Sequence, residues 1–310
     1  MISLRLAALA VAASFAFGIS ASANSNRTFV SAHGSDANPC SAQAPCRSFQ
    51  VAHDHTNAGG EITVLDSAGY GAVTITKAIS IVNDGVGEAG VTVTSGNAIT
   101  INAGVNDAVE LHGLTLVGSG TSTNGITLNS AGTLIVTDGS IRGFTSAGIN
   151  LTPSASSNVA VINTVISDSF DGVFAAPTGG GTVAVSLDGV HLIGYGSVGA
   201  AFDGAASTGS LLATVSNSEA SGGVEGVSAL TVSGKAGPIV QLVNCRISNN
   251  SFFGIVSDGP GAIVLASQTS VFANGTGLHV ANGGLLKSYG DNTVGLNNVD
   301  GSFTETLAKK

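Results

Sequence analysis

Four side chains of this 310-residue sequence could together perform acid–base chemistry: Arg142, Asp168, Asp171 and His191. Arg142 and Asp168 follow the small polar residue of consecutive sequence repeats at almost the same distance, so we expect them to be near neighbours. Two carboxylates, a guanidinium and an imidazole in one place could move protons to and from a substrate. The same residues also fit a solvated corner held by an ion pair between repeats. We favour that interpretation, because the four form no recognised catalytic motif.

A second pair of charges occupies matching positions in two repeats. Glu219 and Arg246 each lie two residues after an asparagine, Asn217 and Asn244 respectively. The matching positions predict that the two side chains stack on adjacent coils as a surface salt bridge. Such an exposed pair is worth at most about 1 kcal/mol.

The cysteines indicate one disulfide. Cys40 and Cys46 flank Pro45 in a loop-like segment, and we predict a local disulfide between them in an oxidising compartment. Two thiols without a matching second pair are a weak zinc signal. Cys245 is left over and is expected to be a small buried side chain.

Two histidines near these cysteines also raise the question of a metal. His53 and His55 flank Asp54 in the segment from Ser48 to Asn57, which we predict to be a short amphipathic helix. Residues two apart on a helix do not share a face, so the histidines should point in different directions. We therefore expect no metal ligands and no cofactor.

These residues are positioned by one repeated pattern that runs from about Gly125 to Asn298. Each repeat begins with glycine and an apolar residue, at intervals of roughly 23 to 28 residues: Gly125-Ile126, Gly148-Ile149, Gly172-Val173, Gly199-Ala200, Gly226-Val227, Gly254-Ile255 and Gly277-Leu278. A small polar residue follows later in each repeat: Asp138, Asn163, Asp188, Asn217, Asn244, Gln268 and Asp291. Both kinds of residue suit corners where the backbone needs φ > 0.

The period and the alternation of apolar residues between these corners predict an all-β solenoid. The long, irregular spacing fits three strands per coil, which is a right-handed parallel β-helix of about ten coils. A β-sandwich is the alternative, but its hairpin turns would recur every eight to twelve residues. Asp138-Gly139 and Asp188-Gly189 recur at the long period instead.

The composition limits location and partners. Residues 1–23 read as a signal peptide, so we expect a secreted or periplasmic protein that begins near Asn24. No later stretch is apolar and long enough to span a bilayer. The net charge is −9 and the ten Lys and Arg residues are scattered, which argues against nucleic acid as a partner.

We divide the rest into an N-terminal cap with the cysteine loop and helix (24–60), the β-helix (61–298) and a C-terminal cap or tail (299–310). The short helix, followed by Gly59-Gly60-Glu61-Ile62-Thr63-Val64 and Gly69-Tyr70, resembles the N-terminal cap of the pectin-lyase-like superfamily of right-handed β-helices. With the downstream repeats, the chain is most similar to exported bacterial β-helix repeat proteins that have no assigned activity.

The resemblance implies acidic polysaccharides as substrates if the chain is an enzyme. Lyases of this superfamily carry clustered Asp ligands for Ca²⁺ with a basic residue nearby, so Ca²⁺ is expected only under that alternative. Hydrolases carry Asp-Asp, Gly-His-Gly and Arg-x-Lys signatures, which are absent from this sequence. Between Lys77 and Lys287 the basic residues are Arg142, Lys235 and Arg246, and anionic sugars need more cationic partners than that.

We therefore favour a non-catalytic carbohydrate-binding, surface-binding or structural module. Its strand faces would present Ser, Thr and Asn to a polysaccharide or cell-surface glycan. The alternative is a polysaccharide lyase or glycoside hydrolase that acts on acidic polysaccharide. Exposed aromatic platforms are not expected, because Phe144, Phe170 and Phe253 fall at corners and should face the core. The oligomeric state is not predicted.

Overall fold

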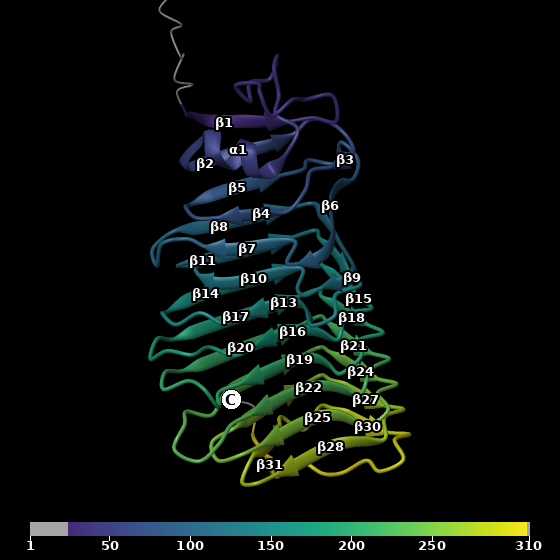
Figure 1. The fold of residues 1–310 in the computed structure, drawn as a ribbon. Helices are drawn as coiled ribbons and strands as arrows, with labels where there is room; N and C mark the ends of the chain where they lie inside the picture. Colours follow the sequence, from purple (N-terminus) through teal and green to yellow (C-terminus); the bar gives the residue numbers. More distant parts are fainter. Residues whose placement is uncertain (1–23, 309–310) are drawn as a thin grey trace, which may run out of the picture.

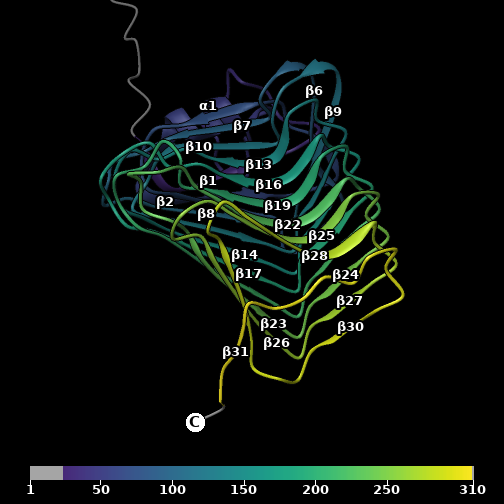
Figure 2. The ribbon, with the colours of Figure 1, turned by 90° about the horizontal axis from the view of Figure 1, so that it is seen from below.

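The structure, a computed structural model, describes residues 24–308 and shows a stack of coils built from three parallel sheets (Figure 1). Seen from the C-terminal end, the sheets lie along the sides of each coil (Figure 2). We call them sheets A, B and C. Sheet A has 12 strands, sheet B has 10 and sheet C has 9, which gives about nine complete coils. The predicted parallel β-helix is confirmed.

The strands follow one another along the axis in each sheet. Sheet A consists, in spatial order, of β1 (Ser25–Val30), β2 (Thr56–Val64), β5 (Ile79–Val82), β8 (Ala108–His112), β11 (Thr133–Thr137), β14 (Ser157–Ile162), β17 (Val183–Asp188), β20 (Leu211–Ser216), β23 (Ile239–Val243), β26 (Ile263–Ser267), β29 (Leu285–Ser288) and β31 (Glu305–Thr306). Sheet B consists of β3 (Ala68–Gly69), β6 (Ala89–Gly96), β9 (Leu114–Ser122), β12 (Ser140–Arg142), β15 (Val165–Ser167), β18 (His191–Ile193), β21 (Glu219–Ser221), β24 (Arg246–Ser248), β27 (Ser270–Phe272) and β30 (Thr293–Gly295). Sheet C consists of β4 (Val73–Ile75), β7 (Ile99–Asn102), β10 (Ile126–Ser130), β13 (Ala147–Leu151), β16 (Asp171–Ala175), β19 (Val198–Asp203), β22 (Glu225–Leu230), β25 (Phe253–Asp258) and β28 (Thr276–Ala281).

The core is a set of apolar columns that run along the axis. In sheet A, Leu134 is in register with Val159, and Val159 with Val185, and all three are buried. Alternate residues of a strand point inward, so each coil adds one layer to a continuous core and contacts mainly its two neighbours.

Five of the seven small polar corner residues adopt the positive φ that the sequence predicts, and Asp188 and Asp291 do not. Asp138, Asn163, Asn217, Asn244 and Gln268 have φ between 47° and 55°. In the repeat that contains Asp188, the next residue, Gly189, takes this role with φ of 64°. Asparagine, aspartate and glycine tolerate this left-handed region better than other residues.

The prediction that the repeat glycines need positive φ is wrong. None of these glycines has a φ in the left-handed region. They are needed because the coils approach too closely for a side chain. A Cβ would lie 2.5 Å from the carbonyl oxygen of the next coil at Gly125 and Gly226, and 2.6 Å from it at Gly199 and Gly254.

The N-terminal end of the core is covered by α1 (Phe49–His55) and β1. The Ser48 side chain accepts a hydrogen bond from the Val51 N–H and caps the helix. Phe49 is fully buried against the ring of Tyr70, with ring centroids 5.0 Å apart. The predicted disulfide joins Cys40 and Cys46 in the loop beside the helix.

At the other end, β31 pairs with β29 as the last strand of sheet A. The boundaries proposed for the cap, the β-helix and the tail stay predictions. The signal peptide predicted for residues 1–23 lies outside the described residues. Among residues 24–308, no helix has the length and apolar character needed to cross a membrane.

Candidate functional site

The structure places Arg142 and Asp168 on adjacent coils. Arg142 ends β12 and is in register with Ser167, the residue before Asp168. Both side chains are exposed. Asp168 turns the chain out of β15 with a φ of 53°. Within residues 24–308, no hydrogen bond or ion pair joins the guanidinium to this carboxylate, so the predicted corner ion pair is not formed.

The other two candidates lie elsewhere on the surface. His191 begins β18 in sheet B and is in register with Val165 and Glu219. Asp171 begins β16 in sheet C, where its carboxylate accepts a hydrogen bond of 3.1 Å from the Val198 N–H. Burial raises the pKa of Asp171. Within residues 24–308, no hydrogen bond or ion pair joins any two of the four candidates, and their catalytic role stays a prediction.

His191 instead belongs to a ladder of ionisable groups on sheet B. Glu219 and Arg246 are in register, and their side chains form the predicted salt bridge at 3.3 Å. The Nδ1 atom of His191 lies 3.8 Å from the same carboxylate. The guanidinium of Arg246 also lies over the ring of Phe272, 5.7 Å from its centroid. We call His191, Glu219 and Arg246 the ion ladder; it lines a hollow of about 360 Å³.

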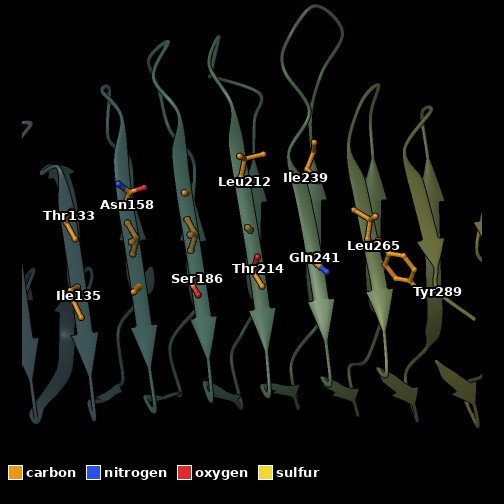
Figure 3. Close-up of a pocket in the computed structure, with 15 residues that line it drawn as sticks. Thr133, Ile135, Asn158, Ser186, Leu212, Thr214, Ile239, Gln241, Leu265 and Tyr289 are labelled. Atoms are coloured by element: carbon orange, nitrogen blue, oxygen red, sulfur yellow. The ribbon is translucent and has the colours of Figure 1, made fainter. Parts of the chain in front are cut away.

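Another hollow lies on the outer face of sheet A, and we call it the sheet A trough. It encloses about 560 Å³ over strands β11 to β26 (Figure 3). Its outward side chains are Thr133, Ile135, Asn158, Ala160, Ala184, Ser186, Leu212, Thr214, Ile239, Gln241, Leu265 and Tyr289.

The register between coils explains why this face is hollow. One row of outward side chains runs through Ile135, Ala160, Ser186, Thr214 and Gln241. The side chains become short at Ala160 and Ser186 and longer again toward Gln241. A second row, parallel to the first, also has a short side chain at its centre, Ala184. Short side chains in the middle of both rows leave the space.

The second row adds apolar walls. It runs from Thr133 through Asn158 and Ala184 to Leu212 and Ile239. Leu212 is 40% exposed and Ile239 is 42% exposed, so both present aliphatic carbon to the solvent. The trough therefore combines hydroxyl and amide groups with aliphatic carbon.

Among residues 24–308, no charged side chain lines the trough. Among residues 24–308, the charged side chains that are in register with the first row lie beyond its two ends. Glu110 lies one coil before Ile135. At the other end, Lys287 follows Leu265 in register and forms a 2.8 Å ion pair with Glu305.

One aromatic side chain closes the C-terminal end of the trough. The ring of Tyr289 lies beside Leu265 in Figure 3, and the Tyr289 side chain is half-buried. Its backbone N–H donates a hydrogen bond of 3.1 Å to the carbonyl of Ala266, which continues the ladder of sheet A. The ring thus offers a flat apolar surface next to polar side chains.

The structure corrects the prediction for the corner phenylalanines. Phe144 is buried as predicted, at 2% exposure. Phe170 is 54% exposed and does not face the core, and Phe252 is 56% exposed. Phe253 is half-buried and stacks on His279, with ring centroids 4.0 Å apart.

Only part of the trough was predictable from the sequence. Small polar residues on strand faces were expected, but the aliphatic walls were not. Leu211-Leu212 and Ile239-Val240 carry the signal that could have found them, because two adjacent apolar residues in a strand place one of them on the outer face.

Comparisons with known proteins support the fold and leave the function open. No protein-family model matches the chain, and no curated protein matches it. The structure is similar to the crystal structure of pectate lyase Pel9A, with a TM-score of 0.62 and 14% identity over 91% of this chain and 80% of that chain. The A-module of the Azotobacter vinelandii mannuronan C-5 epimerase AlgE4 matches with a TM-score of 0.39 and 10% identity, over 81% of this chain and 91% of that one. The enzymatically active domain of bacteriophage CBA120 tailspike protein 2 matches with a TM-score of 0.39 and 12% identity, over 82% and 45% of the two chains.

The likeness to pectate lyase Pel9A supports the right-handed parallel β-helix fold that the N-terminal cap and the repeats predict. At 14% identity it speaks for the fold alone.

Proposed function

We propose that this protein is a non-catalytic β-helix module that binds an uncharged polysaccharide or surface glycan along the sheet A trough. The observation that carries the proposal is the trough itself: a hollow of about 560 Å³ that the described residues line with hydroxyl, amide and aliphatic groups and with no charge. We further propose that the protein acts outside the cytoplasm, where the Cys40–Cys46 disulfide would persist.

The chemistry of the trough suits a neutral sugar polymer. Exposed groups on Asn158, Ser186, Thr214 and Gln241 can donate and accept hydrogen bonds with sugar hydroxyls. The aliphatic side chains and the Tyr289 ring can cover the apolar faces of the sugar rings. Successive coils repeat at about 4.8 Å, so the trough offers similar groups at regular steps to a polymer with its own short repeat.

Electrostatics favour an uncharged ligand over an acidic one. The chain has a net charge of −9, and a polyanion would be repelled at long range. Carboxylate recognition normally uses arginine or lysine, and the described lining of the trough has neither.

A matched pair of substitutions tests the proposal. Thr214→Arg places a long charged side chain in the middle of the trough, and Thr121→Arg makes the same change at an exposed threonine of β9 in sheet B. We expect Thr214→Arg to weaken binding to neutral glucans or mannans at least tenfold and Thr121→Arg to leave it unchanged. Equal binding by both variants would show that the trough is not the site.

The enzyme alternative, a lyase or hydrolase for acidic polysaccharide, is favoured by one observation. The ion ladder sets an imidazole and a guanidinium on either side of one carboxylate in an open hollow. Incubation with pectate and alginate, with and without Ca²⁺, should yield no new chain ends if the module is non-catalytic. New ends that disappear in Glu219→Gln or Asp168→Ala would instead support an enzyme.

A further inference from the structure

The N-terminal cap brings a histidine against the two cysteines of the disulfide. The Nδ1 atom of His55 lies 3.0 Å from the Sγ atom of Cys40 and 3.9 Å from that of Cys46. All three atoms lie within 4.8 Å of one another. The cysteines are fully buried and the histidine is half-buried, so the group opens to solvent only on the histidine side.

The local fold explains why His55, and not His53, reaches the sulfurs. Both histidines lie in the last turn of α1, two residues apart, so they point to different sides of the helix. His53 turns toward the β-helix, where its Nε2 accepts a hydrogen bond of 3.2 Å from the Thr76 N–H. His55 turns toward the cysteine loop. Among residues 24–308, its Nδ1 has no hydrogen-bond partner other than the two sulfurs.

We propose that Cys40, Cys46 and His55 form a redox-gated site for a soft divalent metal ion such as Zn²⁺. Two thiolates and one imidazole are a ligand set that zinc prefers, and three protein ligands leave a fourth position for solvent. The backbone carbonyl oxygen of Asn38 lies 3.6 Å from the Cys46 sulfur.

The disulfide and the metal exclude each other. With the disulfide formed, neither sulfur is a thiolate, and the site is closed. A dithiol reductant transfers two electrons and two protons to the disulfide, which becomes two thiols, while the reductant becomes a cyclic disulfide. The metal then replaces the two thiol protons, which leave to solvent. Without the S–S bond, the sulfurs can separate by rotation of their side chains to hold the ion between them and Nδ1.

Both the disulfide and the bound metal would link Cys40 to Cys46 within the cysteine loop, next to α1. The loop backbone is anchored on β1, because the Phe29 N–H donates to the Cys40 carbonyl and the Cys46 N–H donates to the Phe29 carbonyl. These hydrogen bonds do not depend on the disulfide, so they hold both thiols near His55 after reduction. The metal adds a link from the loop to α1 that the disulfide lacks.

Cobalt binding to the full chain tests the site. The protein carries Cys245→Ala throughout, so that the third cysteine cannot contribute. After reduction by a dithiol and removal of the reductant without oxygen, Co²⁺ should bind at one ion per chain. Binding should give a thiolate-to-cobalt charge-transfer band that Zn²⁺ abolishes. The oxidised protein should give no band.

Two histidine variants test whether His55 is a ligand of the metal ion. His55→Ala should weaken Co²⁺ binding more than about tenfold, because even neighbours of a metal ligand cost ten- to a hundred-fold when lost. His33→Ala, a change at an exposed histidine of the same cap, should leave binding unchanged. Absence of the band in the reduced protein would overturn the proposal, as would equal binding by His55→Ala and His33→Ala.

Discussion

At the scale of single residues, Asn250 links several polar side chains at the corner between sheets B and C. Its carbonyl oxygen accepts a hydrogen bond from the Tyr195 hydroxyl, and its amide donates one of 2.9 Å to Asn274. Asn274 in turn donates one of 2.9 Å to Asn297, so the ladder spans successive coils. Asn250 is buried at 1% exposure, so its partners depend on it rather than on solvent.

Asn250→Ala should lower the free energy of unfolding by about 2–3 kcal/mol, because it leaves the Tyr195 hydroxyl and the Asn274 carbonyl oxygen with fewer partners. The matched control is Asn129→Ala, which removes an exposed asparagine that bonds to Asn102 on the neighbouring coil. Denaturant unfolding of both variants measures the difference. Similar losses would show that the buried ladder is no more important than an exposed one.

The raised pKa of Glu225 leads to a prediction of how the stability of the protein changes with pH. Burial raises its pKa, and the nearby carboxylates of Asp171 and Asp258 raise it further. A carboxyl whose pKa is higher in the folded state contributes stability below its unfolded pKa, and this contribution is lost as the pH rises through the folded pKa. At neutral pH the charge therefore destabilises the fold.

Glu225→Gln should make the protein more stable than the wild type at neutral pH, and this gain should shrink as the pH falls through the carboxyl range. Glu88→Gln, at an exposed glutamate, is the control for the change of side chain. Thermal unfolding at several pH values is the measurement. A gain in Glu225→Gln that persists unchanged in acid would contradict the account.

At the scale of elements, the coils stack closely because each begins with glycine. A Cβ at Gly226 would lie 2.5 Å from the carbonyl oxygen of Gly254 and 3.0 Å from the side-chain amide nitrogen of Asn250. Neither the backbone at Gly254 nor the asparagine ladder that contains Asn250 can move without disturbing the neighbouring coil. The close packing of the coils therefore requires glycine at position 226.

Gly226→Ala should therefore destabilise the protein by about 1–3 kcal/mol, the usual cost of overpacking. Gly295→Ala in β30 is the control, because a Cβ there meets nothing within 4 Å and its φ is not left-handed. Unfolding midpoints in denaturant compare the two. If Gly226→Ala were as stable as Gly295→Ala, close stacking would not be the reason for the repeat glycine.

The elements show why the fold was predictable and the sites only partly so. The glycine at the start of each repeat and the small polar residue at its later corner recur because every coil must stack closely on the next and turn at the same place. The repeat along the sequence therefore predicts the solenoid and the Glu219–Arg246 pair. The interval between repeats varies, so the sequence does not show which outward side chains line up across successive coils. The trough depends on that alignment.

The path of the cysteine loop also could not be predicted from the sequence. The short separation of Cys40 and Cys46 predicted the disulfide. The contact with His55 depends on how the loop folds back on the end of α1, and no spacing encodes it. Likewise, Asp168 and His191 lie in similar repeats, but His191 is drawn to Glu219 on the following coil.

At the scale of the whole molecule, charged side chains are kept away from the middle of sheet A. Within residues 24–308, the trough occupies the middle of sheet A without a charge, and ion pairs lie at both ends of that sheet: Arg27–Glu61 at 2.9 Å and Lys287–Glu305 at 2.8 Å. A long parallel sheet with an uncharged trough suits an extended polymer better than a compact ligand. Binding to this face should depend little on ionic strength, because salt screens only charges.

The most direct test of the central claim is therefore binding to neutral and acidic polysaccharides at low and high salt. We predict that a neutral glucan or mannan binds with an affinity that changes less than about twofold between the two salt concentrations, since the described lining of the trough is uncharged. Pectate and alginate should bind more weakly than the neutral polymer at both concentrations. Preferential binding of the acidic polymers, falling steeply with salt, would contradict the account.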